Sequence, residues 1–427
     1  MRIAMVTFGT RGDVQPFVAV GKTLQARGHD VVVGAPEDYV GFVRASGLAA
    51  HPIEGNIEAL LATPSGRQWV QEGNARALGR AMVENFRALA AGVERDVQAL
   101  CQGAEVVVTG VLPAGMSRTF ATVRGVSCVI VHLSPGTPSS SWPLSFLDLP
   151  LWLPRAFNRL SASLSWRVLW SLLRDLDDDT RARLALPRAR YDPCMEAHRT
   201  RAPTLHLWSP TLLPPPPEWG PSEHVAGFCT VPSSLRTALA EDAAVQELEA
   251  FLREGPPPVF LGLGSMPIWS PRTTIGMMVE ALSSLGCRAV IGGTFGERDE
   301  VAALLPPTMR LVGAVDHDVL FPRCAAVVHH GGVGSLHTGL RAGRATLVCS
   351  VLGDQPFWGR VIERRGVGTW TRFRTLTTQS LRRGLEHILR DDVQARAKAL
   401  GEALRAEPPG NDAAADVIEA AAKRRRL

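Results

Sequence analysis

The sequence predicts an α/β protein of two domains, each built on a parallel sheet that helices cover on both faces. The chain has 427 residues, which is too long for one ordinary hydrophobic core. Short, continuously apolar runs alternate with helix-sized segments, and strands of this kind are typical of buried parallel sheets. Four successive prolines within 211–223 separate two such halves, because consecutive prolines cannot join a helix or an inner strand.

The first half opens on a strand–helix–strand pattern. Residues 2–8 are an apolar run, Pro16 stands in the first turn of an expected helix, and "DVVVGAP" is the next buried strand. The runs "AEVVVTG" and "VSCVIVHLSP" follow an Ala- and Leu-rich helical stretch at 76–101. We therefore expect an N-terminal domain over 1–213 and a proline-rich linker over 214–225.

The second half repeats this pattern. Five short apolar runs are separated by helix-sized segments: "PPVFLGLGSM", "CRAVIGG", "RLVGAV", "AAVVHHGG" and "ATLVCSV". They predict a second α/β domain over 226–405. Residues 406–427 read as a helical tail, which we expect to cross back to the N-terminal domain.

Composition excludes several classes of function. The formal charge is +5, and basic and aromatic residues do not alternate as in nucleic-acid binders. The N-terminus lacks the pattern of a signal peptide, and no stretch has the 18 or more apolar residues of a membrane span. Seven scattered cysteines without CxxC spacing indicate reduced thiols and a cytoplasmic protein. The basic end "KRRRL" leaves a weak peripheral membrane contact open.

The segment 327–368 carries the strongest chemical signal. A strand runs into His329, His330 and three glycines, and a helix then begins near Ser335. Such a turn lets backbone N–H groups and the helix dipole meet an anion, best a diphosphate. After the next strand, Asp354 and Gln355 stand in a loop where they can accept from and donate to sugar hydroxyls.

This segment resembles the donor-binding signature of the family 1 nucleotide-sugar glycosyltransferases. Members of that family have the GT-B architecture, in which the parallel sheets of two Rossmann-like domains face an interdomain cleft. Four further motifs, "GTRGDVQP", "RGHDV", "LGLGSM" and "DHDVLFPRC", narrow the resemblance. They are similar to the branch that holds sterol glucosyltransferases and bacterial glycosyltransferases of macrolides and glycopeptides.

The resemblance implies a donor site in the second domain. Donor diphosphate binding would fall to Ser265, His330, Gly332, Val333, Gly334 and Ser335. The nucleoside would lie against Val315, Asp316 and His317, and the sugar against Asp354 and Gln355. For His329 a role in the core, or in support of the site, is favoured. Both UDP- and dTDP-linked donors stay open, because the base-stacking aromatic residue of many relatives has no obvious counterpart in 311–317.

The resemblance also implies a catalytic base in the first domain. Many plant relatives read "GHxxP" where this chain reads "GDVQP", so Asp13 stands in place of the basic histidine. An ordinary aspartate has a pKa of about 3.9, so burial would have to raise it. The alternative is that Asp13 caps the helix expected to begin near Pro16.

The acceptor region is assigned to Thr10, Arg11, Trp142, Phe146 and Trp152. The Trp-rich segment 142–176 has three possible roles: a helix packed on the first domain, a pocket for a large apolar acceptor, or a membrane-surface contact. The acidic run "DLDDD" at 175–179 contains a DxD pair that in another glycosyltransferase architecture binds a metal. Here a solvated helix face is favoured, and we expect no metal and no other cofactor.

The function expected from these residues is an inverting transfer of a hexose, most simply glucose, to a hydroxyl of a large apolar aglycone such as a macrolide or other polyketide. A sterol or lipid glucosyltransferase is the first alternative. A catalytically inactive sugar-nucleotide-binding homologue and a GT-B epimerase are the others. The partners are a nucleotide-sugar donor and an apolar small molecule, and the protein is a monomer or a homodimer.

Overall fold

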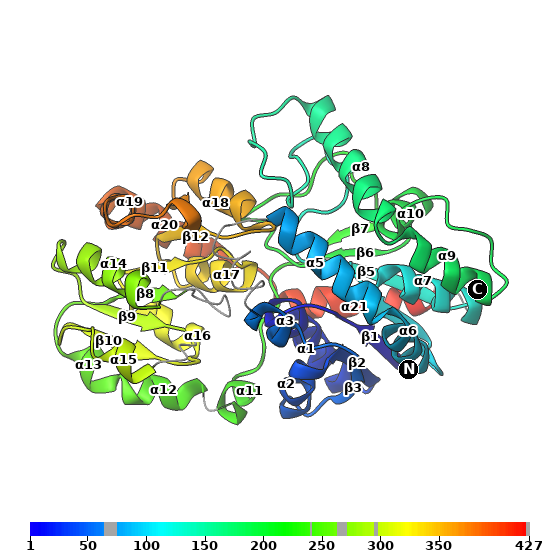
Figure 1. Cartoon of the computed structure of the whole chain (residues 1–427), viewed down its shortest axis with the longest axis horizontal. Coiled ribbons are helices and arrows are strands. Elements are labelled where there is room, and N and C mark those ends of the chain that lie inside the picture. The colour runs from blue at the N-terminus through cyan, green and yellow to red at the C-terminus, as the bar shows by residue number, and fades with distance from the viewer. Residues whose placement is uncertain (64–74, 240, 263–270, 294–297, 424–427) are drawn as a thin grey trace.

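The computed structural model describes residues 1–63, 75–239, 241–262, 271–293 and 298–423 (Figure 1). Its strands form two sheets, one of seven strands and one of six, and every strand pair found in these ranges is parallel. The two sheets lie in separate halves of the molecule. The predicted architecture of two α/β units with parallel sheets is thereby confirmed.

The first sheet has the order β3-β2-β1-β4-β5-β6-β7. Its strands are β1 (Arg2–Val6), β2 (Asp30–Pro36), β3 (Ala49–Ile53), β4 (Val106–Thr109), β5 (Ser127–His132), β6 (Thr204–His206) and β7 (Glu223–Val225). The helices of this half are α1 (Arg11–Ala26), η1 (Glu37–Tyr39), α2 (Val40–Ala45), α3 (Ile57–Ala62), α5 (Ala75–Ala88), α6 (Ala90–Cys101), α7 (Ala114–Arg124), α8 (Arg155–Ser171), α9 (Arg174–Arg183) and α10 (Pro193–Thr200).

The second sheet has the order β10-β9-β8-β11-β12-β13. Its strands are β8 (Val259–Gly262), β9 (Ala289–Gly292), β10 (Met309–Val312), β11 (Ala326–His329), β12 (Thr346–Ser350) and β13 (Gly368–Arg372). The helices are α11 (Ser233–Ala238), α12 (Glu241–Glu247), α13 (Glu249–Arg253), α14 (Pro271–Ser283), α15 (Arg298–Ala302), α16 (His317–Leu320), η2 (Phe321–Arg323), α17 (Val333–Arg341), α18 (Gln355–Arg364), η3 (Phe373–Thr375), α19 (Thr378–Ile388), α20 (Asp391–Arg405) and α21 (Gly410–Lys423).

Both sheets follow the doubly wound order in which the chain moves outward from one central strand and then returns to the other side of it. The first sheet reverses between β1 and β4, and the second between β8 and β11. Open α/β sheets bind ligands at the carboxyl ends of their strands beside such a reversal. The loop after β1 and the glycine-rich turn after β11 therefore each lie beside the reversal of their own sheet.

Two segments differ from their expected form. Helix α1 begins at Arg11, so Pro16 lies inside the helix and not in its first turn. Thr10 and Asp13 form a capping box that supplies this earlier start, since each accepts a hydrogen bond from the other's backbone. The range 214–225, expected to be linker throughout, ends in β7, which pairs with β6 at the edge of the first sheet.

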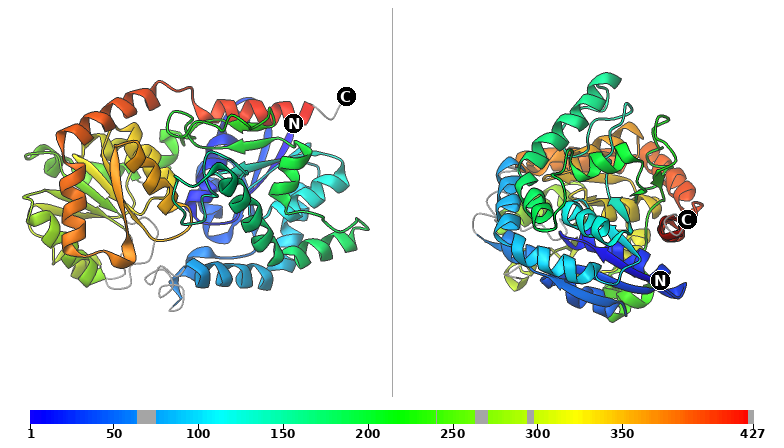
Figure 2. Two further views of the ribbon diagram at one scale, coloured as in Figure 1. Left: turned by 90° about the horizontal axis from the view of Figure 1, so that it is seen from above. Right: turned by 90° about the vertical axis from the view of Figure 1, so that its right-hand side faces the viewer.

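The C-terminal helix lies against the first half. Ile418 of α21 belongs to the same buried cluster as Phe17 and Leu24 of α1, and Figure 2 shows α21 running beside the N-terminal sheet. Arg27 fixes the contact at its end, because its guanidinium is 2.6 Å from the Asp416 carboxylate. Residues 424–427 of the basic end lie outside the described residues.

Candidate active site

The turn after β11 depends on two glycines. Gly331 has a φ of +97°, and a Cβ there would stand 2.7 Å from Val348 Cγ1. Gly332 is the N-cap of α17, and a Cβ there would stand 2.4 Å from His330 Nε2. The His330 imidazole therefore lies against the start of α17, and a side chain at Gly332 would displace it.

His330 is a neutral imidazole in this position. Burial lowers its pKa to about 4, and its Nδ1 has no hydrogen-bond partner among the described residues. The first turn of α17 presents the N–H groups of Val333, Gly334 and Ser335, which have no partner within the helix. The partial positive charge at the N-terminus of α17 favours a phosphate group, and the neutral imidazole can donate a hydrogen bond to it.

His329 supports this turn from behind. It is 1% exposed, and its Nδ1 accepts a hydrogen bond from the Gly331 N–H at 2.9 Å. Burial holds the pKa of this histidine well below its ordinary value. His329 therefore has the supporting role that the sequence favoured, and it shapes the turn that carries His330.

Asp354 and Gln355 begin helix α18. The Asp354 carboxylate accepts a hydrogen bond from the Trp358 indole N–H at 3.0 Å, and burial raises its pKa to about 6. Gln355 Oε1 accepts from the backbone N–H groups of Val351 and Leu352 at 2.7 and 3.1 Å. The Gln355 carbonyl oxygen is thus already used by its own loop, and only its NH₂ group remains to meet a ligand.

Asp13 lies in the first turn of α1, directly after the loop that follows β1. Its Oδ2 accepts from the Thr10 backbone N–H at 2.7 Å and from the Thr10 hydroxyl at 3.2 Å. The backbone approaches this carboxylate closely at Gly9, which has a φ of +148° and where a Cβ would stand 2.2 Å from Oδ2. Burial raises the pKa of Asp13 above its ordinary value. Asp13 therefore takes part in capping α1. It also lies at the carboxyl edge of the sheet, where open α/β sheets bind ligands.

The two halves meet at these residues. The negative charge of Asp13 contributes to the raised pKa of Asp354, and the nearby Ser134 side chain acts in the opposite direction. Ser134 follows β5 of the first sheet, whereas Asp354 follows β12 of the second. The carboxyl ends of the two sheets therefore face each other across the domain interface.

A network of charged side chains crosses the same interface. Arg11 is 2.5 Å from the Glu241 carboxylate of α12, and Arg236 hydrogen-bonds to the other oxygen of Glu241 at 2.9 Å. Arg236 also lies 3.7 Å from Asp316 and 3.0 Å from Asp318. No motif in the sequence points to Arg236 or Glu241, because they lie in a segment with ordinary helical composition. Arg11, expected in the acceptor region, contacts the second domain.

The three residues expected to bind the nucleoside have different structural roles. Val315 is 5% exposed in the core, and the Asp316 carboxylate accepts the Asp318 N–H at 2.9 Å to cap α16. The His317 ring stacks on Phe321 with 4.4 Å between ring centres. Burial lowers the pKa of His317 to about 3, and the charges of Arg236, Arg11 and His330 act in the same direction.

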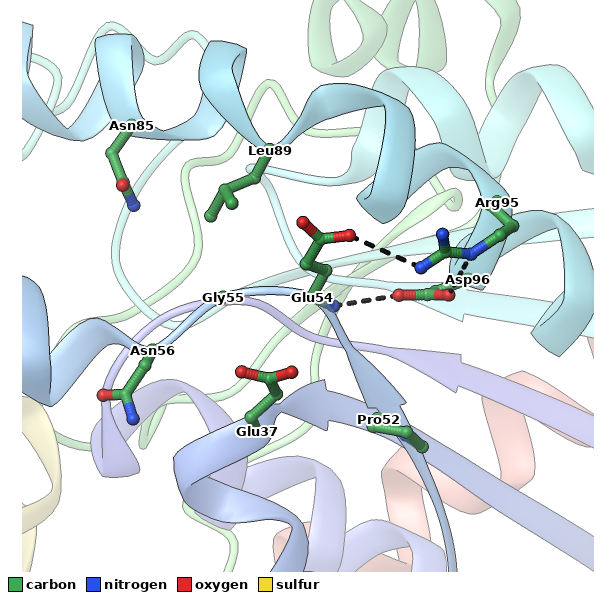
Figure 3. A pocket seen from close by; sticks show the side chains of 9 residues that line it. All are labelled: Glu37, Pro52, Glu54, Gly55, Asn56, Asn85, Leu89, Arg95 and Asp96. Atoms are coloured by element: carbon green, nitrogen blue, oxygen red, sulfur yellow. Dashed lines mark hydrogen bonds and ion pairs between the residues drawn. The ribbon is translucent and has the colours of Figure 1, made fainter.

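An open groove of about 560 Å³ lies at the carboxyl ends of β2 and β3 (Figure 3). Its lining includes Glu37, Glu54, Asn56, Asn85, Leu89, Arg95 and Asp96. Arg95 lies 3.4 Å from Glu54 and 3.0 Å from Asp96. Phe8, in the segment between β1 and α1, lies close to Gly55 of the groove lining. The lining is mainly polar, in contrast to the apolar acceptor pocket expected from the Trp-rich segment.

The residues expected to form the acceptor region have different surroundings. Trp142 is 7% exposed and packs edge-to-face on Trp219, with 6.2 Å between ring centres. Phe146 and Trp152 are 47% and 80% exposed. Of this set, Thr10 alone contacts Asp13 directly through hydrogen bonds.

Two other predicted features can be placed. The acidic run forms helix α9 as expected, but Asp177 within it is buried and does not face solvent. It packs against Gly115 of α7, where a Cβ would stand 1.9 Å from its carboxylate. Ser265 lies outside the described residues. Among the described residues no helix is both long enough and apolar enough to cross a membrane.

Two family models match the chain. Residues 3–111 match the N-terminal domain of glycosyltransferase family 28, and residues 277–420 match the C-terminal domain of erythromycin biosynthesis protein CIII-like proteins. An uncharacterized glycosyltransferase of Mycobacterium leprae is 32% identical, over 100% of this chain and 98% of the relative. A sterol 3-beta-glucosyltransferase of Arabidopsis thaliana is 30% identical, over 95% of this chain and 66% of the relative.

Solved structures share the fold at lower identity. The glycosyltransferase VinC in complex with dTDP has a TM-score of 0.67 at 20% identity, covering 99% of this chain and 100% of that chain. The calicheamicin glycosyltransferase CalG4 has a TM-score of 0.65 at 16% identity, covering 99% of this chain and 98% of that chain. These likenesses and the two parallel sheets confirm the predicted GT-B fold.

Proposed function

Because this chain belongs to the family 1 glycosyltransferases of GT-B architecture, we propose that it is an inverting hexosyltransferase. It takes a sugar, most simply glucose, from a UDP- or dTDP-linked donor and passes it to a hydroxyl of an apolar aglycone. The observation that carries the proposal is the glycine-rich turn of His330 at the start of α17, which packs against Gln355 at the start of α18. We propose a cytoplasmic location, which the seven unpaired cysteines support.

The donor would bind to the second domain. The diphosphate would accept hydrogen bonds from His330 and from the first N–H groups of α17, where the helix dipole also favours a negative charge. The Asp354 carboxylate and the free NH₂ of Gln355 would meet the sugar hydroxyls. On this proposal the leaving diphosphate is stabilised by the protein's own donors, and no metal ion is required.

The chemical step would be a single displacement. The acceptor oxygen attacks the anomeric carbon while the bond from that carbon to the diphosphate oxygen breaks, which inverts the configuration. Asp13 would take the proton of the acceptor hydroxyl. The burial that raises the pKa of Asp13 makes its carboxylate a better base, and Thr10 holds it in place through two hydrogen bonds.

Two acceptor classes follow from different observations. The fold shared with the calicheamicin glycosyltransferase favours a natural-product acceptor such as a macrolide or other polyketide. The likeness to a sterol 3-beta-glucosyltransferase over 95% of the chain favours a sterol or lipid acceptor. The polar groove after β2 and β3 suits an acceptor that carries several polar groups besides its apolar frame.

The substitution Asp13→Asn tests the catalytic assignment. It should reduce sugar transfer to background, because an amide cannot take the acceptor proton, and it should leave donor affinity within a few-fold of the wild type. Transfer is measured by mass spectrometry over a panel of polyketides and sterols with UDP-glucose and dTDP-glucose. Donor affinity is measured by calorimetry.

Asp30→Asn is the matched control, since Asp30 is an exposed carboxylate at the opposite end of the same sheet. Undiminished transfer by the Asp13 variant would remove Asp13 as the base. Donor binding without any transfer, even with the wild type and the full panel, would favour an inactive homologue. Conversion of the donor alone into an isomeric sugar would favour an epimerase.

A further inference from the structure

Helix α8 carries its large aliphatic residues on its exposed side. Phe157, Leu160, Leu164 and Val168 are 45%, 61%, 57% and 58% exposed. Their spacing of three and four residues places them on one face of the helix, and Leu172 extends the stripe just beyond its end at 38% exposure. We call this stripe of five residues the α8 ridge.

The inner face of α8 is less aliphatic than the ridge. It buries two tryptophans, Trp166 and Trp170, together with the small or polar residues Asn158, Ser161 and Ala162. A surface helix of a globular protein normally turns its leucines and phenylalanines inward. A continuous apolar strip exposed along a whole helix marks an interaction site.

The charged residues of α8 are all positive. Residues 155–171 contain Arg155, Arg159 and Arg167, each exposed, and no aspartate or glutamate. Arg159 lies 3.6 Å from Glu218, while Arg155 and Arg167 have no ion pair within the described part of the chain. The nearest acidic run, on α9, is partly neutralised, since Asp175 pairs with Arg87 and Asp178 with Arg174.

The position of α8 leaves the ridge free to meet a broad surface. Figures 1 and 2 show α8 projecting at the periphery of the N-terminal half, with the loop that precedes it at its outer end. That loop carries Trp152 at 80% exposure and Phe146 at 47%. Aromatic residues are enriched where a protein meets the boundary between lipid and water.

We propose that α8 is a membrane-docking helix that lies in the headgroup region of an anionic bilayer, with the ridge toward the acyl chains. An exposed helix with an apolar face and with arginines as its only charged residues has the properties of such interfacial helices. A second copy of the chain is a poorer occupant, because a ridge packed on a ridge would bring arginines together without any acidic residue of α8 to pair with them. Membrane docking through α8 is separate from the transfer reaction and is expected with either class of acceptor.

The test is co-sedimentation with vesicles. Wild type should bind vesicles of 70% phosphatidylcholine and 30% phosphatidylglycerol, and bind pure phosphatidylcholine at least about tenfold more weakly, because the arginines add attraction to anionic lipid. The triple variant Leu160→Ser, Leu164→Ser, Val168→Ser should lose about tenfold or more in binding to the mixed vesicles, since it removes apolar area. The pair Arg155→Gln, Arg167→Gln should remove the preference for phosphatidylglycerol.

The control variant is Val123→Ser, Val319→Ser, which removes two apolar residues of similar exposure, 51% and 47%, away from α8. It should bind vesicles as the wild type does, and circular dichroism should show that all variants are folded. Wild type that stays in the supernatant with mixed vesicles, or a folded triple variant that binds undiminished, would overturn the proposal. A dimer that the triple variant dissociates, together with no vesicle binding, would make a second copy the occupant of the ridge.

Discussion

The residues next to His330 in the chain set the position of its ring. Gly332 leaves room for its ring, Gly331 turns the chain beneath it, and His329 accepts the N–H of that turn. Burial lowers the pKa of His330 to about 4, so the ring meets a ligand as a neutral donor at pH 7. Its buried Nδ1 has no partner among the described residues, which is costly, and a bound diphosphate would supply an acceptor.

His330→Ala should therefore weaken donor binding by about 1–3 kcal/mol, the usual effect of losing one hydrogen bond to a charged group. His330→Gln, which keeps a donor at a similar distance, should recover part of that loss. Calorimetry with UDP and dTDP measures both variants against the wild type. Equal donor affinity in all three proteins would move the diphosphate site away from α17.

Helix α9 shows how one side chain can face inward from a helix whose composition indicates a solvated surface. Its run "DLDDD" has the composition of an exposed helix, yet Asp177 is 9% exposed and packs on Gly115 of α7. Burial raises the pKa of Asp177 to about 7, and the charge of Asp192 nearby adds to this. In the unfolded chain the same carboxyl ionises near pH 3.8.

This difference predicts a pH dependence of stability. Between about pH 4 and 7 the folded protein holds a proton on Asp177 that the unfolded chain releases, so the free energy of unfolding contributed by this group falls as pH rises. Asp177→Asn removes the penalty and should stabilise the protein at pH 8 by on the order of 2 kcal/mol, and much less at pH 4. Denaturant titration at both pH values measures this.

Asp175→Asn on the same helix is the control. Its side chain is 54% exposed and paired with Arg87, so the change should stay within about 0.5 kcal/mol at either pH. A gain from Asp177→Asn that is equal at pH 4 and pH 8 would show that its carboxyl titrates normally in the folded protein.

Charged contacts between the two halves near the candidate active site, together with the C-terminal helix, hold the two halves together. Glu241, 2% exposed, lies between Arg11 of the first half and Arg236 of the second. Ser209 hydrogen-bonds to Glu407 before α21 returns to the N-terminal sheet. These links fix how the start of α1, with Asp13, faces the start of α18, with Asp354.

Glu241→Gln should lower the free energy of unfolding by about 1–3 kcal/mol, because it leaves two arginines at the interface without their shared carboxylate. Glu249→Gln is the control, since Glu249 pairs with Arg323 on one half alone and both side chains are partly exposed. Its effect should be below about 1 kcal/mol. Equal effects of the two substitutions in denaturant titrations would show that the interdomain network contributes nothing of its own.

Much of the fold was predictable because its signals are local. Continuously apolar runs such as β4 predict buried parallel strands, since a strand covered on both faces must be apolar at every position. The turn from His329 to Ser335 was predictable because glycine is required wherever a backbone must turn left-handed or approach a neighbour closely. The start of α1 was misplaced because Pro16 is a strong local signal, whereas the reciprocal bonds of Thr10 and Asp13 are visible only in three dimensions.

Local sequence patterns predict the two parallel-sheet domains, the glycine-rich turn and the polar residues at the strand ends, because each depends on neighbours a few positions apart. The packing of the two halves determines that Asp13 contributes to the raised pKa of Asp354, that Arg11 pairs with Glu241, and that Trp142 is buried while the α8 ridge is exposed. These features join residues that are far apart in the chain. They depend on how two sheets and their helices pack, and no local pattern encodes that packing.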